Sequence, residues 1–234
     1  MPRLRKQSAR LQGFLSRPAA DVLIRPYQPG DREAVRQICC DTADCGQPVE
    51  NFFHDREFIA DVVTRYYTDF EPQFSWVAEH EGQVVGYLNG CLDTRRSQRI
   101  TGWRIAPAAV LRAVWRGALG RRETWRWFCA MWRTGRSGDR QRRELLRSYP
   151  AHLHVNLQSG FRGEHVGRRL VEKFFEQVRV AGLPGIHASV RGDNASGCRF
   201  FEQLGFTELA RSPMILPHND RWLNTHSVIY GKTM

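Results

Sequence analysis

Three side chains that can hold or exchange protons occupy every second position of one short segment. His152, His154 and Asn156 alternate there with apolar residues. Because successive side chains of a β-strand point to opposite faces, residues 151–157 are predicted to form a strand with these three groups on one face. A neutral imidazole can take a proton from an attacking nucleophile, so mid-strand His154 is our first candidate general base. The alternative is that the three groups satisfy buried polar atoms between the strand and a covering helix.

Two other side chains are candidate bases on weaker grounds. Asp93 stands at the end of a predicted strand over residues 83–92 and is expected to face the segment that follows. His187 lies on a predicted strand over residues 186–190. We rank Asp93 second and His187 third. No metal site is predicted, because the six cysteines show no paired Cys-x-x-Cys spacing and no histidine spacing suited to zinc.

The turn that follows the first strand has the composition of an anion site. Gly163 and Gly167 stand beside Arg162 and Arg168, at the predicted start of a helix over residues 163–180. The first turn of a helix has backbone N–H groups without intrahelical partners, and its dipole favours negative charge. Glycine lets a ligand approach the backbone closely. A phosphate or pyrophosphate is therefore expected at this turn.

The turn resembles the acyl-CoA signature of the GNAT acetyltransferase family, Arg/Gln-x-x-Gly-x-Gly/Ala. Arg162 matches the first position and Gly167 the last, while His165 replaces the middle glycine. A second block also resembles the family: it opens with Asn194 and continues through an aromatic pair to Gly-Phe at residues 205–206. The resemblance covers residues 22–232, interrupted by a long insertion.

This resemblance implies that acetyl-CoA lies in a split between the strands of residues 151–157 and 186–190, with its pantetheine arm paired to the first strand. It implies that an amine attacks the thioester directly. Asn194 would hold the pantetheine arm, or else serve only as a helix N-cap. The cofactor-binding residues implied in this way are Val155, Leu157, Arg162, Gly163, His165, Val166, Gly167, Arg168 and Asn194.

The general acid is the point at which the chain departs from the family. The family's usual acid is the tyrosine of a Phe-Tyr pair, and Phe201 stands at that position here. Cys198 and Tyr230 are candidate substitutes, and a thiolate with a pKa near 8.5 can also leave without full protonation. Two functions stay open: an N-acetyltransferase acting on a primary amine of a small molecule or peptide, or a non-catalytic acyl-CoA-binding module.

The elements needed to position these groups indicate an α/β protein with a mixed central sheet of six to seven strands flanked by helices. Residues 1–20 are predicted to be a basic arm, and residues 21–234 a single domain with a helical insertion at 94–149. The further strands are expected over residues 22–26, 74–79, 206–210 and 225–230. The further helices are expected over residues 31–40, 55–67, 107–120, 123–133, 139–147 and 195–204.

Charge is concentrated in the insertion. The chain carries a net charge of +11, and residues 95–147 hold fifteen arginines against three acidic residues. Five tryptophans share this segment. Such a surface can bind an anionic partner such as nucleic acid or an anionic membrane, or it can form a lid over the acceptor site.

The remaining sequence features concern location and closer relatives. No apolar run is long enough to span a membrane, the N-terminus does not resemble a signal peptide, and the thiols suit a reducing compartment, so a cytoplasmic location is expected. Within the GNAT family, the His-Leu-His strand and the long insertion resemble bacterial acetyltransferases related to the C-terminal domain of O-GlcNAc hydrolases.

Overall fold

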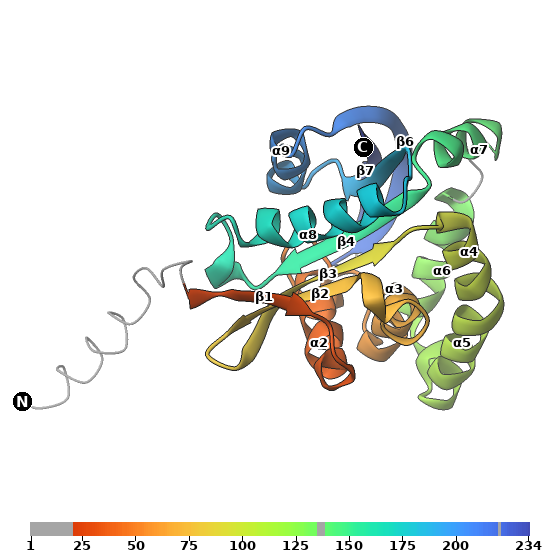
Figure 1. Ribbon diagram of the computed structural model, residues 1–234. Helices are drawn as coiled ribbons and strands as arrows, with labels where there is room; N and C mark the ends of the chain where they lie inside the picture. The colour runs from red at the N-terminus through yellow and green to blue at the C-terminus, as the bar shows by residue number, and fades with distance from the viewer. Residues whose placement is uncertain (1–20, 135–138, 220) are drawn as a thin grey trace, which may run out of the picture.

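The computed structural model describes residues 21–134, 139–219 and 221–234. The predicted basic arm of residues 1–20 lies outside the described residues. The described chain folds around a seven-stranded sheet in the order β1-β2-β3-β4-β5-β7-β6 (Figure 1). The strands are β1 (Leu23–Pro26), β2 (Ser75–His80), β3 (Gln83–Cys91), β4 (Ala151–Leu157), β5 (Gly185–Arg191), β6 (Thr207–His218) and β7 (Arg221–Thr233).

Helices cover both faces of this sheet, as the sequence predicts. Figure 1 shows α8 along one face and α2 with α3 along the other, with α4, α5 and α6 of the insertion beyond α3. The α-helices are α2 (Arg32–Thr42), α3 (Arg56–Asp69), α4 (Thr94–Ile100), α5 (Ala106–Trp115), α6 (Arg122–Thr134), α7 (Asp139–Ser148), α8 (Val166–Val180) and α9 (Ala195–Gln203).

The main core lies between α8 and the sheet. Leu170, Phe174 and Val178 recur at intervals of four residues, so they form one apolar stripe, and all three are fully buried. The packing is tight enough to require glycine in the facing strand. A Cβ added at Gly90 on β3 would lie 2.3 Å from Cε2 of Phe174. This packing fixes where α8 begins relative to the end of β4.

The helix that the sequence places at Pro107 begins earlier, at Thr94. α4, a π-helical turn (Thr101–Ile105) and α5 run on from one another. The Asp93 carboxylate caps α4 by accepting from the backbone N–H groups of Arg95 and Arg96. Pro107 has no N–H for the regular helical pattern, and the π-helical turn ends just before it.

The last two strands are longer than the sequence indicates. The sequence predicts strands near residues 206–210 and 225–230, and β6 continues through Pro213 and Pro217. Both prolines pair within the β6–β7 hairpin. Strand β6 is the last strand of the sheet, so the N–H groups that proline lacks are not needed by a further strand.

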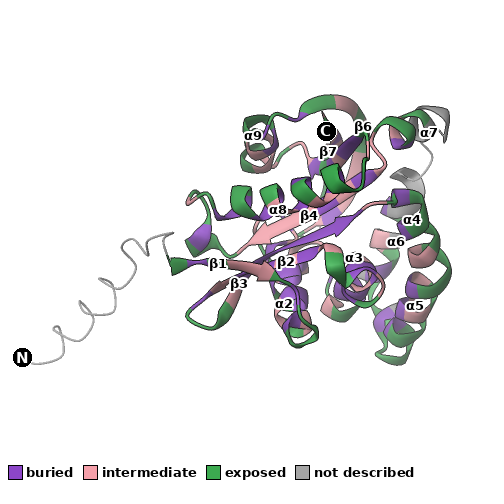
Figure 2. Ribbon diagram, viewed as in Figure 1, coloured by how far each residue is buried: buried purple, intermediate pink, exposed green. Residues whose placement is uncertain are grey.

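The decisive feature of the fold is a separation between its two parallel strands. β4 and β5 pair only at Ala151↔Ile186 and His152↔His187. On its other side β4 stays paired with β3 up to Leu157. Figure 2 shows the result: β4 is only partly buried, although it lies beside the buried strand β3 in the middle of the sheet. The edge of β4 beyond His152 is therefore open toward β5.

No helix within the described part of the chain is long and apolar enough to cross a membrane.

Candidate active site

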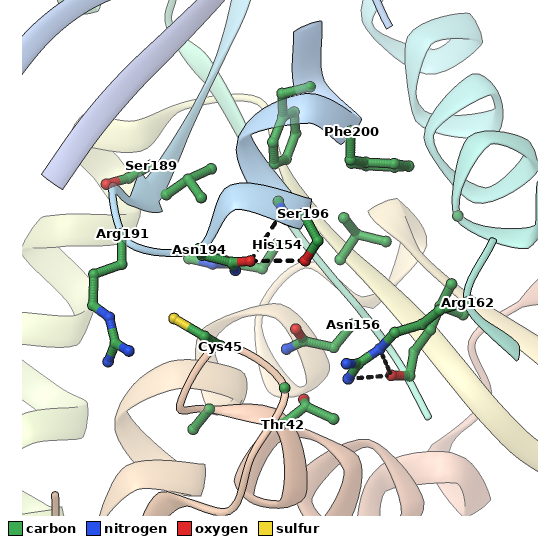
Figure 3. A pocket seen from close by; sticks show the side chains of 18 of the residues that line it. Thr42, Cys45, His154, Asn156, Arg162, Ser189, Arg191, Asn194, Ser196 and Phe200 are labelled. Atoms are coloured by element: carbon green, nitrogen blue, oxygen red, sulfur yellow. Dashed lines mark hydrogen bonds between the residues drawn. The ribbon is translucent and has the colours of Figure 1, made fainter. Parts of the chain in front are cut away.

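A cavity of about 750 Å³ opens where β4 and β5 separate. Its walls come from β4, β5, the start of α8, α9, α2 with the loop after it, α3, and one residue of α6. Figure 3 shows Thr42 and Cys45 on one side facing Asn194 and Ser196 on the other, with Arg162 at one end. The cavity thus joins the predicted anion turn to the predicted base face.

Left-handed backbone shapes the turn at the start of α8. Gly163 has φ +84° and His165 has φ +61°. The helix therefore begins at Val166 rather than at residue 163, the predicted start. No side chain of the described residues caps it, so the N–H groups of its first turn remain available to a ligand beside the cavity.

Gly167 lies in the first turn of α8, where the helix passes close to α9. A Cβ at this position would lie 3.1 Å from Cε2 of Phe200 and 3.4 Å from Cδ1 of Leu157. Both Gly167 and Phe200 line the cavity. The absence of a side chain therefore allows close helix packing and close approach of a ligand to the same backbone.

The two arginines of the turn take roles that the sequence does not reveal. Arg162 donates to the carbonyl oxygen of Leu157 from Nε at 3.0 Å and from Nη2 at 2.9 Å, and so closes the end of the β4 edge. Its guanidinium also lies against Gly46. Arg168 donates to the carbonyl of Gln203 at the end of α9. Both side chains line the cavity while bound to backbone carbonyls.

Asn194 combines the two roles that the sequence left open. Its Oδ1 accepts from the N–H of Gly197 at 2.9 Å and from Oγ of Ser196 at 3.0 Å, so it is the N-cap of α9. The residue also lines the cavity, as Figure 3 shows. Capping uses only the oxygen and holds the amide group in place at the cavity wall.

His154 lies on the cavity wall, in the middle of β4. Burial and the neighbouring His187 lower its pKa to about 4, so the ring is neutral near pH 7. Among the described residues we find no hydrogen bond to this ring. Its neighbour in register, Asn89 on β3, is 1% exposed, and neither amide atom has a hydrogen-bond partner there. His154 and Asn89 thus place two polar side chains next to each other in a buried part of the sheet.

His152, on the same face, is fixed by a chain of hydrogen bonds. The Thr94 hydroxyl donates to the carbonyl of Pro150 at 2.6 Å, so its oxygen accepts from Nδ1–H of His152 at 2.7 Å. Nε2 of His152 then accepts from the Tyr67 hydroxyl at 2.6 Å. Burial holds the pKa of His152 well below its usual range. The polar atoms of His152 are therefore satisfied by neighbouring groups of the fold, which is the alternative to a catalytic role.

Other candidates lie away from the cavity wall. Asp93 is exposed and caps α4, and Val166 is buried in the core under α8. His187 donates from Nδ1 to the carbonyl of Tyr149. Neither of the proposed substitute acids lines the cavity: the Tyr230 hydroxyl donates to Glu202, and Cys198 lies behind the wall.

Phe201 occupies the position of the family's tyrosine and lines the cavity. Its ring stacks on Tyr230, with the centroids 6.2 Å apart. Tyrosine is absent from the described residues that line the cavity, so a phenolic acid is not available at this wall.

One buried carboxylate that the sequence analysis missed holds the rim of the cavity together. Asp44, 4% exposed, pairs with Arg191 at the end of β5, at 2.6 Å. It also accepts from Asn51 and lies 3.1 Å from Nε2 of His218. The N–H donors hold its pKa below the usual range. These partners are 7 to 174 residues away in the chain, so no local pattern could have indicated them.

Comparisons with known proteins agree with this geometry. The sequence model of the "Acetyltransferase (GNAT) family" matches residues 142–206. Mycothiol acetyltransferase of Nocardiopsis dassonvillei is 35% identical over 66 residues, which are 28% of this chain and 20% of that protein.

Two solved structures extend the likeness over most of the chain. The crystal structure of SsHAT is 26% identical, with a TM-score of 0.65 over 91% of this chain and 98% of that one. The structure of yncA from Salmonella typhimurium with its cofactor acetyl-CoA is 18% identical, with a TM-score of 0.56 over 91% of this chain and 94% of that one. The second likeness concerns the fold alone.

The chain spans only about a fifth of the length of mycothiol acetyltransferase, so that protein's substrate is not carried over. The family match and the likeness to SsHAT coincide with the separated strands, the anion turn and the helix after Asn194. On this combination, the chain belongs to the GNAT acetyltransferase superfamily.

Proposed function

We propose that this protein is an acetyl-CoA-dependent N-acetyltransferase that acts on a primary amine. The observation that carries the proposal is the open edge of β4, which leads from the uncapped start of α8 to His154 within one cavity. An extended chain with amide groups can pair with such an edge, and a pyrophosphate suits the helix N-terminus.

The residues of the cavity fit acetyl-CoA by their chemistry. Val155 offers the open edge, Leu157 lines the cavity at the end that Arg162 closes, Gly163 and Gly167 allow close approach to backbone N–H groups, and Asn194 offers its amide. When bound, acetyl-CoA supplies an acetyl group activated as a thioester. His165 and Arg168 lie beside the same turn and belong to its phosphate side.

The reaction that this arrangement supports is direct attack. The amine nitrogen bonds to the acetyl carbon, the C–S bond breaks, CoA leaves as a thiolate, and the proton that the amine gives up passes to water. His154 is neutral near pH 7 and can accept a hydrogen bond from the amine. A base with a pKa near 4 is weak, so it orients the amine and passes the proton to water. The unpartnered amide of buried Asn89 offers such a water a place beside His154.

One observation favours a second function, a non-catalytic acyl-CoA-binding module. Phe201 leaves the cavity wall without a phenolic acid, so the kind of proton donor that the family uses is missing from the described side chains that line it. The enzyme hypothesis requires that the thiolate leaves unprotonated or takes its proton from water.

Release of free CoA distinguishes the two functions. The protein is mixed with acetyl-CoA and a panel of primary amines, and free thiol and acetylated product are measured together. Turnover that depends on both protein and amine supports the enzyme. His154→Gln keeps a polar side chain but removes the imidazole, and it should lower kcat at least tenfold with unchanged CoA affinity. Tight CoA binding without any product would establish the binding module instead.

A further inference from the structure

We infer that the acceptor is a primary amine with an apolar, uncharged body and no second cationic group. This inference rests on the proposed function, because it concerns the acceptor end of the same cavity. The anion turn marks one end of the cavity, so the end beyond His154 is left for the acceptor. The face of β4 that carries His154 is turned toward α3, because the Tyr67 ring lies 5.5 Å from that of His154 and its hydroxyl bonds to His152. We take this side, where residues of α2, α3, α6 and the loop that contains Phe52 line the cavity, as the acceptor end.

Large apolar side chains dominate this end. Phe52, Ile59, Val63 and Trp127 line it. Trp127 belongs to the insertion and is the described residue through which the insertion reaches the cavity wall. Aromatic and aliphatic walls of this kind gain free energy from the apolar surface that a ligand buries against them.

Trp127 is held in place by other aromatic rings. Its centroid lies 5.0 Å from that of Phe53 and 5.6 Å from that of Phe58, the second in an edge-to-face arrangement. Such pairs are favourable geometries for aromatic rings. The ring therefore presents a fixed apolar surface.

The charge of the cavity points to the same class of acceptor. None of the described residues that line it carries a carboxylate, whereas four of them are arginines. The nearby carboxylates of Asp44 and Asp193 are both paired with Arg191. A second ammonium or guanidinium group on the acceptor would lose its water without gaining a counter-ion, which costs several kcal/mol.

The polar groups near this end are neutral. His154 is uncharged near pH 7, and Asn156 donates to the hydroxyl of Tyr87. Burial raises the pKa of the Cys39 thiol to about 11, so it too is uncharged. The reacting amine can bind beside His154 as the neutral amine. The second ammonium group of a diamine would find no carboxylate among the described residues that line the cavity to balance its charge.

The experiment compares hexylamine with 1,5-diaminopentane, which have similar reach and differ in one terminal ammonium. Binding of each to the CoA-saturated protein is measured by calorimetry, with 2-phenylethylamine as an aromatic third probe. We expect hexylamine and 2-phenylethylamine to bind at least tenfold more tightly than the diamine. Equal binding, tighter binding of the diamine, or no binding of any of the three overturns the inference.

Two variants make the test specific to the named walls. Trp127→Ala should weaken 2-phenylethylamine binding at least tenfold and leave CoA affinity within twofold, which also shows that the variant is folded. Phe52→Glu places a carboxylate at the partly buried rim and should shift the preference toward the diamine. If neither variant changes the preference, the inference is wrong.

Turnover of the same three amines separates this inference from the proposed function. If hexylamine binds selectively but no amine is acetylated, the proposed activity fails and the acceptor class stands. If 1,5-diaminopentane is acetylated with the higher kcat/KM, the proposed activity stands and the acceptor class fails.

Discussion

At the scale of single residues, His165 is unusual because a side chain with a Cβ adopts a left-handed backbone. Its φ of +61° falls where the family has glycine, and its side chain is exposed. A non-glycine residue in this conformation costs roughly 1–2 kcal/mol, which the greater flexibility of an unfolded glycine offsets only in part. The substitution by histidine is therefore expected to cost stability.

His165→Gly should raise the free energy of unfolding by about 0.5–1 kcal/mol, because it removes this strain. It should leave turnover within a few-fold, since His165 lies on the phosphate side of the cavity. Urea unfolding and steady-state kinetics measure the two effects. The matched control is Gly163→Ala, which creates the same strain at φ +84° and should lower stability. A hundredfold loss of turnover in His165→Gly would contradict its placement.

The two strand histidines should make the fold sensitive to mild acid. Their pKa values are lowered in the folded protein, to about 4 for His154, against about 6.5 when unfolded. Between these values the unfolded chain binds more protons than the folded one, so stability is full above pH 6.5 and falls as pH drops toward 4.

Each histidine should therefore contribute a slope of up to about 1.4 kcal/mol per pH unit in this window. Urea unfolding at a series of pH values measures the slope. In His154→Gln the slope should be smaller than in the unmodified protein. An unchanged slope in His154→Gln would show that this ring is not kept neutral by the fold.

The candidate site was predictable from sequence only where local patterns encode it. A period of two placed His154 on the polar face of β4, and the glycine turn placed Gly167 at the start of a helix. The pairing of Asp44 with Arg191, in contrast, joins segments that only the folded sheet brings together. Asp93, the second candidate base, is the N-cap of α4, a role that its place at a strand end did not indicate in the sequence.

At the scale of elements, the first turn of α8 lies against α9, next to the turn of residues 162–168. Gly167 allows this contact, because a Cβ there would meet the ring of Phe200 at 3.1 Å. Gly167→Asp should lower CoA affinity at least tenfold, or about 1.4 kcal/mol, since it adds bulk and negative charge beside the phosphate side. Calorimetry with CoA measures the effect.

Gly167→Ala separates bulk from charge. A methyl group requires Phe200 to move by only a few tenths of an ångström, so CoA affinity should fall by less than in Gly167→Asp. Phe200→Leu in the same chain should recover part of any loss. Unchanged CoA binding in folded Gly167→Asp would show that the phosphates bind elsewhere.

The sequence indicated every strand of the sheet but misjudged some boundaries for identifiable reasons. Pro107 was taken as a helix start although the chain was already helical from Thr94. Strand β6 runs well beyond the predicted end at residue 210, and it contains Pro213 and Pro217, which an edge strand tolerates.

At the scale of the whole molecule, the arginines of the insertion divide into two groups. Arg96, Arg112 and Arg116 form ion pairs with acidic residues of the preceding elements. Arg99, Arg104 and two further exposed arginines, Arg121 and Arg122, show no ion pair with the described residues. Beside them, Trp103 and Trp115 are 82% and 85% exposed. The cluster Arg140, Arg142 and Arg143 lies outside the described side chains.

The unpaired group should govern attraction to an anionic partner. Neutralising Arg99, Arg104, Arg121 and Arg122 to Gln should weaken binding to heparin, used as a model polyanion, and flatten its salt dependence. CoA affinity should stay within twofold. The matched control neutralises Arg112 and Arg116. This variant should have a lower free energy of unfolding, while its heparin binding should change little. If the first variant loses CoA affinity and keeps its salt dependence, these arginines serve the cofactor and the assignment is wrong.

The open edge of β4 also bears on how long the protein survives. Backbone groups left unpaired in the middle of a sheet exchange their amide protons readily and can pair with another chain. A ligand that pairs with this edge forms hydrogen bonds where a neighbouring strand would otherwise form them. At a free concentration of a hundred times its Kd, such a ligand raises the free energy of unfolding by about 2.7 kcal/mol. Amide exchange along β4 should therefore slow when CoA is present. If the proposed function holds, acetyl-CoA is a protecting agent as well as a co-substrate, and preparations stripped of CoA ligands should be the ones that aggregate.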